Sequence, residues 1–241
     1  MSMFSGIGGA MSGATVEMTR LQVLSNNLAN INNAGFKQER LLFEAELDNA
    51  GGGMGEGINK RSITGTHTDF TQGALQYTGR ELDVAIKGDG FFKVATDDGF
   101  AYTRHGSFVL QPDGALVTPG GHQVVGETGP VTLPDGEVSI SEEGEILGPN
   151  GPAGQIDLYT VADRQQLEKE AENLWRRPDD VAEELAQDGS LHQGQLESAN
   201  VSAIKMTTEL IEAGRSFESF QKAIKAYDKV AEKTNTVGRI G

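Results

Sequence analysis

The stretch "LESANVSAIKMTTELIEAGRSFESFQKAIKAYDKVA", residues 196–231, places apolar side chains in alternating steps of three and four residues. Positions with this spacing fall on one face of a helix, so the stretch predicts a single long α-helix. Ser198 or Asn200 is expected to begin it, because both side chains are good N-caps. Ile204 and Ile211 widen the apolar face, which indicates neighbours on more than one side. The alternating series consists of Leu196, Ala199, Ala203, Met206, Leu210, Ala213, Phe217, Phe220, Ile224, Tyr227 and Ala231.

The N-terminal end of the chain repeats this seam in a weaker form. Its members are Met11, Ala14, Met18, Leu21, Ser25 and Leu28. Gly9 and Gly13 form a pair of small residues one turn apart, which lets helices approach closely. A helix this rich in Gly, Ala and Ser is marginal alone, so burial against a partner has to stabilise it. We therefore expect the two terminal helices to pair as a coiled-coil-like core.

The segment "SNNLANINNAGFKQER", residues 25–40, contains five asparagines within eight residues. Asparagine is unfavourable inside a helix, because its side chain competes for backbone hydrogen bonds. We expect Asn26, Asn27 and Asn30 to bond packed neighbours, since a buried amide without a partner costs about 1–3 kcal/mol. The last two asparagines and Gly35 are expected to end the helix, with Gly35 as a left-handed C-cap.

Between the two helices the apolar period changes to two, which is typical of strands. The segment "LDVAIKGDGFFKVATDDGFAYTRHGSFVL", residues 82–110, alternates apolar and polar residues around two Asp-Gly turns. Further strands are expected at residues 115–118, 122–125, 138–140, 145–147 and 155–161. The sequence therefore predicts an α+β protein with a central, mainly antiparallel β domain.

These patterns divide the chain into five parts. They are an N-terminal helical segment at residues 1–45, a linker and extended segment at 46–80, a β domain at 81–177, a return loop at 178–195 and the C-terminal helix at 196–241. The stretch "AGGGMGEG", residues 50–57, has the composition of a flexible linker.

Composition excludes several classes of function. The net charge is −15, from 20 Lys and Arg against 35 Asp and Glu, which argues against binding to nucleic acid. The chain has no cysteine, so disulfides, thiolate catalysis and cysteine-based metal sites are excluded. No apolar run is long enough for a membrane span, and the N-terminus lacks the pattern of a cleavable secretion signal.

Candidate catalytic and metal-binding residues do not form recognisable motifs. The four histidines, His67, His105, His122 and His192, are scattered without paired spacing. Acidic clusters such as "DDG" fit hairpin turns better than calcium loops, and no serine lies in a nucleophile elbow. We therefore expect no enzymatic activity, no metal, no cofactor and no small-molecule substrate. Two alternatives stay open, namely a carbohydrate-processing enzyme on a β scaffold and an adaptor whose long helix binds one partner.

Four segments in the same order resemble one known family along nearly the whole chain. They are "SNNLANINNAGFK", "LDVAIKGDGFF", "YTRHGSF" and "LESANVSAIKMTTELIEAGRSFE". The family is that of the flagellar basal-body rod and hook proteins. The compact middle resembles the rod proteins, and the short glycine-rich stretch between Glu44 and Ile58 favours the proximal rod level. The distal rod level is the alternative, because the tail "KTNTVGRIG" departs from the endings common in the family.

The resemblance implies a structural subunit of a hollow helical shaft that crosses the periplasm and transmits torque from motor to hook. Its implied partners are copies of itself, other rod proteins and the flagellar type III export apparatus, which would export it without a cleavable signal. The implied assembly residues are Met11, Met18, Leu21, Asn26, Asn27, Leu28, Asn30, Gly35, Leu196, Asn200, Met206, Leu210, Arg215, Phe217, Glu218, Phe220, Ile224 and Tyr227.

Overall fold

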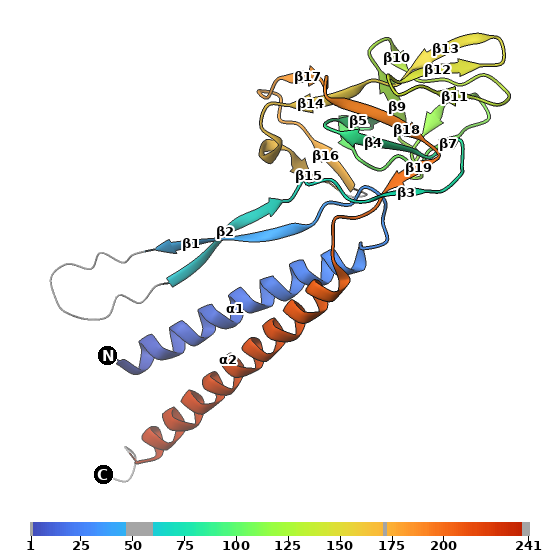
Figure 1. Cartoon of the computed structure of the whole chain (residues 1–241). Coiled ribbons are helices and arrows are strands. Elements are labelled where there is room, and N and C mark those ends of the chain that lie inside the picture. The colour runs from blue at the N-terminus through green and yellow to red at the C-terminus, as the bar shows by residue number, and fades with distance from the viewer. Residues whose placement is uncertain (1, 47–59, 171–172, 238–241) are drawn as a thin grey trace. The chain divides into compact units, whose positions relative to one another are not determined.

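The computed structural model describes residues 2–46, 60–170 and 173–237. As predicted, the fold is α+β, with one long helix near each end of the chain and antiparallel strands between them (Figure 1). The helices are α1 (Ser2–Ala29), the short 3₁₀ helix η1 (Arg164–Gln166) and α2 (Ala203–Val237). The chain divides into two compact units, which are described separately below.

The first unit, called the helical unit, comprises the described parts of residues 1–29, 39–67 and 202–241. Within it α1 and α2 lie side by side in opposite directions, so the start of α1 and the end of α2 are at the same end (Figure 1). The strands β1 (Glu39–Glu46) and β2 (Lys60–Thr68) form a separate two-stranded sheet in this unit. The predicted linker at residues 50–57 lies outside the described residues.

The second unit, called the β unit, comprises residues 30–38 and the described parts of 68–201. Its strands are β3 (Leu75–Tyr77), β4 (Val84–Gly88), β5 (Phe91–Thr96), β6 (Gly99–Thr103), β7 (Val109–Leu110), β8 (Leu116–Val117), β9 (Gln123–Gly126), β10 (Gly129–Pro130), β11 (Ser139–Ile140), β12 (Glu145–Gly148), β13 (Gly151–Gln155), β14 (Leu158–Val161), β15 (Glu168–Lys169), β16 (Leu174–Arg176), β17 (Glu183–Leu185), β18 (Gly189–Gln193) and β19 (Gln195–Glu197).

The largest sheet of the β unit has the strand order β15-β16-β6-β5-β9-β8-β7, with β10 beside β9, β14 beside β5 and β17 beside β14. Smaller sheets are formed by β11-β12-β13, by β18 with β4 and by β19 with β3. The main core contains residues such as Val84, Phe92, Phe108 and Ile146. A second core surrounds Trp175, whose ring packs at 5.8 Å from that of Phe91.

The C-terminal helix begins later than the sequence predicts. Its first residue is Ala203, and the Ser202 carbonyl accepts a hydrogen bond from Met206 N at 2.9 Å. Leu196, which we expected on the helix, instead lies in β19 opposite Gln76. An apolar residue at the right spacing fits a strand end as well as a helix face, so periodicity alone misplaced this boundary.

Two strand predictions are also corrected. The strand expected at residues 155–161 is two strands, because β13 ends at Gln155 and β14 begins at Leu158. The expected return loop at residues 178–195 contains β17 and β18, which pair with β14 and β4. Both strands are mostly polar, and in β18 only Leu191 is fully buried, so the hydrophobic signal for a strand is weak there.

Candidate assembly interface

One face of α1 packs against α2 through small residues. A Cβ atom added to Gly6 would lie 2.7 Å from the hydroxyl of Tyr227, and one added to Gly13 would lie 2.5 Å from the ring of Phe220. Both distances are shorter than van der Waals contact, so the aromatic rings occupy the space that the glycines leave free. Gly9, the expected partner of Gly13 in a small-residue pair, has no atom within 4 Å of that position.

The face of α1 buried in this way is one residue out of phase with the predicted seam. Its fully buried members are Ala10, Leu24 and Asn27, which continue the spacing of Gly6 and Gly13. Four of the six predicted seam positions, namely Met11, Ala14, Ser25 and Leu28, each follow one of these positions by one residue, a rotation of about 100° around the helix. The sequence therefore predicted the helical period of α1 correctly but not the face that α2 covers.

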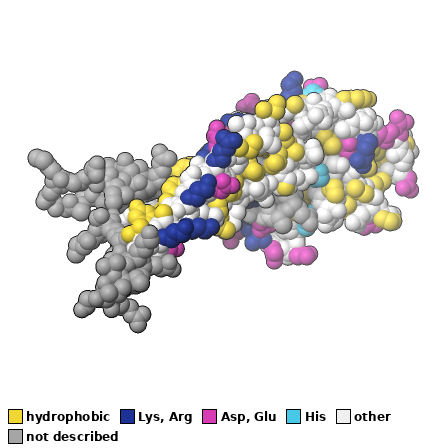
Figure 2. Space-filling model, turned by 90° about the horizontal axis from the view of Figure 1, so that it is seen from below, with side chains coloured by type: hydrophobic (Ala, Val, Ile, Leu, Met, Phe, Trp, Pro, Cys, Tyr) yellow, Lys and Arg dark blue, Asp and Glu magenta, His cyan; other side chains and the backbone are white. Residues whose placement is uncertain are grey.

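The predicted seam of α1 is left as a partly exposed apolar stripe. Met11 is 57% exposed and Met18 is 52% exposed, while Leu21 and Leu28 are half-buried. We call these four residues the outer stripe of α1. Figure 2 shows hydrophobic side chains at the surface beside Lys and Arg on the helical unit.

The face predicted for α2 is the one turned toward α1. Met206 and Ala213 are buried, and the larger members of the series farther along the helix are half-buried, namely Leu210, Phe217, Phe220, Ile224 and Tyr227. Ile204 is 81% exposed and Ile211 is 56% exposed, so they form a second apolar surface on α2. Arg215 and Glu218, both predicted to act in assembly, are also exposed.

The asparagines have separate tasks within the chain. Asn27 is buried, and its Nδ2 donates to Glu39 O at 2.7 Å while its Oδ1 accepts from Glu39 N at 2.9 Å. The structure thus satisfies this amide inside the chain rather than through a neighbour. Asn26 is exposed, and Asn30 Oδ1 accepts from Asn33 Nδ2 at 2.7 Å in the turn after α1.

Gly35 adopts the left-handed conformation that the sequence predicts, with φ of +68°, but it does not cap the helix. The helix ends at Ala29, and the amide of Gly35 instead donates to Glu197 O at 2.7 Å. A Cβ atom at Gly35 would lie 2.4 Å from the carbonyl carbon of Arg104. Glycine is therefore required where two backbones of the β unit meet.

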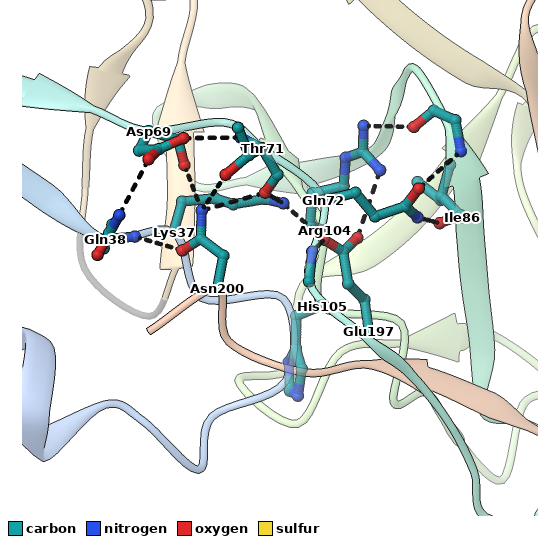
Figure 3. Close-up of polar contacts among 12 residues, drawn as sticks. Lys37, Gln38, Asp69, Thr71, Gln72, Ile86, Arg104, His105, Glu197 and Asn200 are labelled. Atoms are coloured by element: carbon teal, nitrogen blue, oxygen red, sulfur yellow. Dashed lines mark hydrogen bonds and ion pairs between the residues drawn. The ribbon is translucent and has the colours of Figure 1, made fainter. Parts of the chain in front are cut away.

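A buried polar cluster lies next to this contact (Figure 3), and we call it the clasp. Its centre is Glu197, whose Oε1 lies 2.5 Å from Lys37 Nζ and whose Oε2 lies 3.3 Å from Arg104 Nη1. The side chains of Lys37 and Glu197 are 1% and 0% exposed, respectively. Backbone groups complete the bonding, because Lys37 Nζ donates to Thr71 O and Gly73 N donates to Glu197 Oε1.

Asn200 extends the clasp to the segment that leads into α2. Its Oδ1 accepts from Gln38 N at 2.8 Å, and its Nδ2 donates to Asp69 O at 2.7 Å and to Thr71 O at 3.1 Å. Gln38 Nε2 in turn donates to Asp69 Oδ2 at 2.9 Å. The clasp thus fixes four segments distant in sequence, and two of them continue directly into the terminal helices.

Burial dominates the electrostatics of the clasp. Desolvation lowers the pKa of Lys37, and the Glu197 carboxylate opposes this by favouring the charged ammonium. Desolvation likewise lowers the pKa of the Arg104 guanidinium, again opposed by Glu197. One carboxylate therefore holds two cations out of water, an arrangement that is costly to disturb because any remaining charge would be unpaired.

Sequence reasoning named Asn200 for assembly, a role that its bonds within the chain do not test, and it did not single out Lys37, Asp69 or Arg104. A signal was present, since Lys37 and Arg104 each lie inside one of the segments on which the resemblance rests. Which charges would meet could not be read from the sequence, because Lys37 and Glu197 are 160 residues apart.

The structure supports neither a metal site nor a membrane span in the part of the chain that it describes. No group of three or more His, Asp or Glu side chains converges among these residues. Neither described helix is long and apolar enough to cross a membrane.

Family models match three segments of the chain. "Flagella basal body rod protein" matches residues 9–37, "Flagellar hook protein FlgE/F/G D1 domain" matches 85–148, and "Flagellar basal body rod FlgEFG protein C-terminal" matches 192–237. The first match contains α1 from residue 9 onward and the turn after it, and the third contains Glu197, Asn200 and α2.

Similar proteins cover almost the whole chain. The flagellar basal-body rod protein FlgF of Caulobacter vibrioides is 34% identical over 227 residues, which cover 92% of this chain and 91% of the relative. The flagellar basal-body rod protein FlgG of Bacillus subtilis is 35% identical over 259 residues, covering 96% and 97%. The flagellar hook-basal body complex protein FlhO of Bacillus subtilis is 30% identical over 270 residues, covering 99% and 100%. With this identity along nearly its full length, the chain belongs to the family of flagellar basal-body rod proteins.

Proposed function

We propose that the chain is a structural subunit of the bacterial flagellar basal-body rod, without catalytic activity. It would polymerise with copies of itself and with other rod proteins into a hollow helical shaft that spans the periplasm and transmits torque from motor to hook. The observation that carries the proposal is the outer stripe of α1, an apolar seam with helical spacing that α2 leaves partly exposed. Family membership supports the same function.

The outer stripe has the properties of an interface between subunits. Met11 and Met18 are each more than half exposed, and they lie seven residues apart, two turns along the same face. Burying a large apolar side chain contributes about 1.5–3 kcal/mol, so a row of them is a substantial driving force for assembly. In the polymer, α1 and α2 would act as a coiled-coil pair whose second seam binds a neighbouring subunit.

Exposed residues on α2 would complete that interface. Ile204 and Ile211 supply apolar surface on α2, where the packing against α1 does not bury them. Arg215 and Glu218 carry opposite charges on exposed positions, which suits ion pairs that set the register between subunits. The buried members of the predicted set, including Asn27 and Met206, would contribute indirectly by fixing the subunit's own fold.

We further propose the proximal level of the rod, the level of FlgF, with the distal level of FlgG as the alternative. The alignment lengths support this choice. The alignment with FlgF has 227 positions and covers 92% of this chain. The alignment with FlgG covers only slightly more of the chain, 96%, but has 259 positions. The FlgG relative therefore has more residues without a counterpart in this chain. Export through the flagellar type III apparatus without a cleaved signal is part of the same proposal.

The test is the double substitution Met11→Gln and Met18→Gln in a strain that lacks its own copy of the gene. We expect the double variant to fold with unchanged helical circular dichroism but to give no complete basal bodies by electron microscopy and no swimming. The matched control is Leu185→Gln, since Leu185 is 46% exposed on β17 in the β unit. Normal basal bodies with the double variant would contradict the proposal.

A further inference from the structure

A polar pocket of about 580 Å³ lies in the β unit, and none of the four residues of the outer stripe lines it. Four asparagines line it, namely Asn30, Asn32, Asn33 and Asn173. The remaining polar groups are the hydroxyls of two threonines and a serine and the imidazoles of His105 and His122. The described residues that line the pocket include no Asp, Glu, Lys or Arg, and no Phe, Tyr or Trp.

Two adjacent residues belong to the clasp and to the pocket, respectively: Arg104 is part of the clasp and His105 lines the pocket. Figure 3 shows the Arg104 side chain directed into the clasp and the ring of the next residue, His105, directed away from it. Burial lowers the pKa of His105, which keeps its imidazole neutral at physiological pH. The His105 ring therefore offers one donor and one acceptor rather than a charge.

Hydrogen bonds hold the walls of the pocket in place. The backbone amide of His105 donates to Thr103 Oγ1 at 3.0 Å, and the same hydroxyl donates to Asn173 O at 3.0 Å. Asn173 has a φ of +61°, a left-handed conformation that is uncommon for residues other than glycine and that often occurs at functional sites. In the turn after α1, Asn33 N and Asn33 Nδ2 donate to Asn30 O and Oδ1 at 3.0 and 2.7 Å.

A third wall is equally constrained. The turn from Thr118 to His122 is closed by hydrogen bonds from Gly121 N to Thr118 O at 2.9 Å and from His122 N to Thr118 Oγ1 at 3.2 Å. Walls that are fixed before binding reduce the entropy lost when a ligand binds. The volume of the pocket also lies within the range of about 300–1,000 Å³ that is usual for small-molecule sites.

The lining determines the class of ligand. Carboxamides and hydroxyls both donate and accept hydrogen bonds, and so do the hydroxyls of a sugar. A charged ligand would find no counter-ion among the lining residues, and burying its charge unpaired would be costly. A protein segment is less suited, because the centres of protein interfaces favour Tyr, Trp, Arg and apolar side chains. Leu174 and Leu196 provide apolar surface for the C–H groups of a sugar ring.

We propose that this pocket binds a neutral saccharide through the asparagine-rich turn after α1, His105, His122 and the turn at Thr118. The proposal is independent of polymerisation through the outer stripe. It also assigns a function to Asn32 and Asn33, whose side chains are exposed and line the pocket.

The test is isothermal titration calorimetry of the full-length chain with two neutral probes, chitotriose and cellotriose. We expect saturable binding of at least one of them at millimolar concentration, and comparison of the two reports whether the acetamido group is needed. Asn32→Asp preserves the shape of an exposed lining residue but replaces its two N–H donors by a charge, so affinity should fall at least about tenfold. Asn150→Asp, at an exposed asparagine outside the pocket, is the matched control and should bind as the parent does.

The outcomes separate this proposal from the rod function. Absence of binding by both saccharides overturns it, and so does an equal loss of affinity in the two Asp variants. If neither saccharide shifts the NMR signals of His105 and His122 but rod assembly does, the pocket is a subunit contact and the saccharide proposal is wrong. Saccharide binding that Asn32→Asp weakens confirms it, even if the Met11 and Met18 variant still assembles.

Discussion

At the scale of single residues, burial decides what an ion pair contributes. Lys37 Nζ and Glu197 Oε1 lie 2.5 Å apart with side chains that are 1% and 0% exposed. Arg164 Nη2 and Asp89 Oδ2 are also 2.5 Å apart, but these side chains are 27% and 54% exposed. Solvent reaches and screens the second pair, so removing one of its charges costs less. Removing Glu197 would instead leave two cations buried together.

Glu197→Gln is therefore expected to lower the free energy of unfolding by about 3–5 kcal/mol, because Lys37 and Arg104 lose their only shared carboxylate. The same change of acid to amide at Asp89 should cost about 0–1 kcal/mol. Urea titration followed by Trp175 fluorescence measures both values. Equal losses in the two variants would mean that the clasp contributes no more than a surface ion pair.

A buried tyrosine predicts how stability depends on alkaline pH. Burial, reinforced by the hydrogen bond to Glu183, raises the pKa of Tyr102 to about 12 from the ordinary value of 10.0. Between these two pH values the unfolded chain releases the phenolic proton and the folded chain retains it. The contribution of Tyr102 to the free energy of unfolding is therefore fully present below pH 10 and is lost as pH rises toward 12.

Tyr102→Phe should therefore flatten the fall in stability between pH 10 and 12. The free energy of unfolding should still fall with pH in this variant, because burial also raises the pKa of Tyr159 to about 12. Urea midpoints measured across this range test the expectation. Tyr77→Phe, at a side chain that is 82% exposed, is the control and should leave the slope unchanged. An unchanged slope in Tyr102→Phe would exclude this residue as a source of alkaline destabilisation.

At the scale of elements, the contact between α1 and α2 joins glycines of α1 to large aromatic residues of α2. The rings of Phe220 and Tyr227 fill the space beside Gly13 and Gly6. Gly8 and Gly9 lie on the same helix, but a Cβ atom added to either would meet no atom within 4 Å. The helix thus contains glycines that the packing requires and glycines that only lower its intrinsic stability.

Gly13→Val and Gly9→Val separate these two effects. Valine at Gly13 would collide with the Phe220 ring, so we expect a loss of about 1–3 kcal/mol in the stability of the helical unit. Valine at Gly9 meets open space and has a better helix propensity than glycine, so stability should stay equal or rise by a few tenths of a kcal/mol. Thermal unfolding followed by helical circular dichroism measures both. A comparable loss at Gly9 would show that bulk, not the Phe220 contact, causes the effect.

The elements that the sequence predicted well are those with a strong local period. The spacing of α2 predicted both the helix and the face that contacts α1, because Phe220 and Tyr227 of the predicted series lie against Gly13 and Gly6. On α1 the predicted seam followed the spacing of methionines and leucines, whereas Gly6 and Gly13 lie against the aromatic rings of α2, so the spacing of large apolar residues selected the neighbouring face.

Long-range pairing limited the rest of the prediction. β18 and β19 are recognisable only beside their partners β4 and β3, which lie about a hundred residues earlier in the chain. The clasp has the same origin, because Lys37 and Glu197 look like ordinary surface charges until the fold brings them together. The Asn27 amide was predicted to bond a packed neighbour, whereas in the fold both of its polar atoms bond the backbone of Glu39 in the same chain.

At the scale of the whole molecule, the two units differ in how much core they have. Both hydrophobic clusters lie in the β unit and include Trp175, Phe92 and Phe108. Among the described residues of the helical unit, the fully buried apolar side chains are only Ala10, Leu24, Met206 and Ala213. Helices with so little buried surface derive limited stability from packing, so local unfolding should begin there.

The subunit before assembly is therefore expected to unfold in two steps. The helices of 28 and 35 residues dominate helical circular dichroism, whereas Trp175, with 0% exposure, reports on the β unit. In a urea titration the helical signal should disappear at lower urea than the Trp175 fluorescence changes, because the helical unit has the smaller core.

Two variants test whether these steps belong to the two units. Gly13→Val should shift only the helical transition, since Gly13 contacts Phe220 inside the helical unit. Glu197→Gln should shift the Trp175 transition, since the clasp lies in the β unit. Coincident transitions that both variants shift equally would show one cooperative fold instead. A separate, early helical transition would mean that the outer stripe of α1 is presented on the least stable part of the subunit, so burial between neighbouring subunits would order the helices as the rod forms.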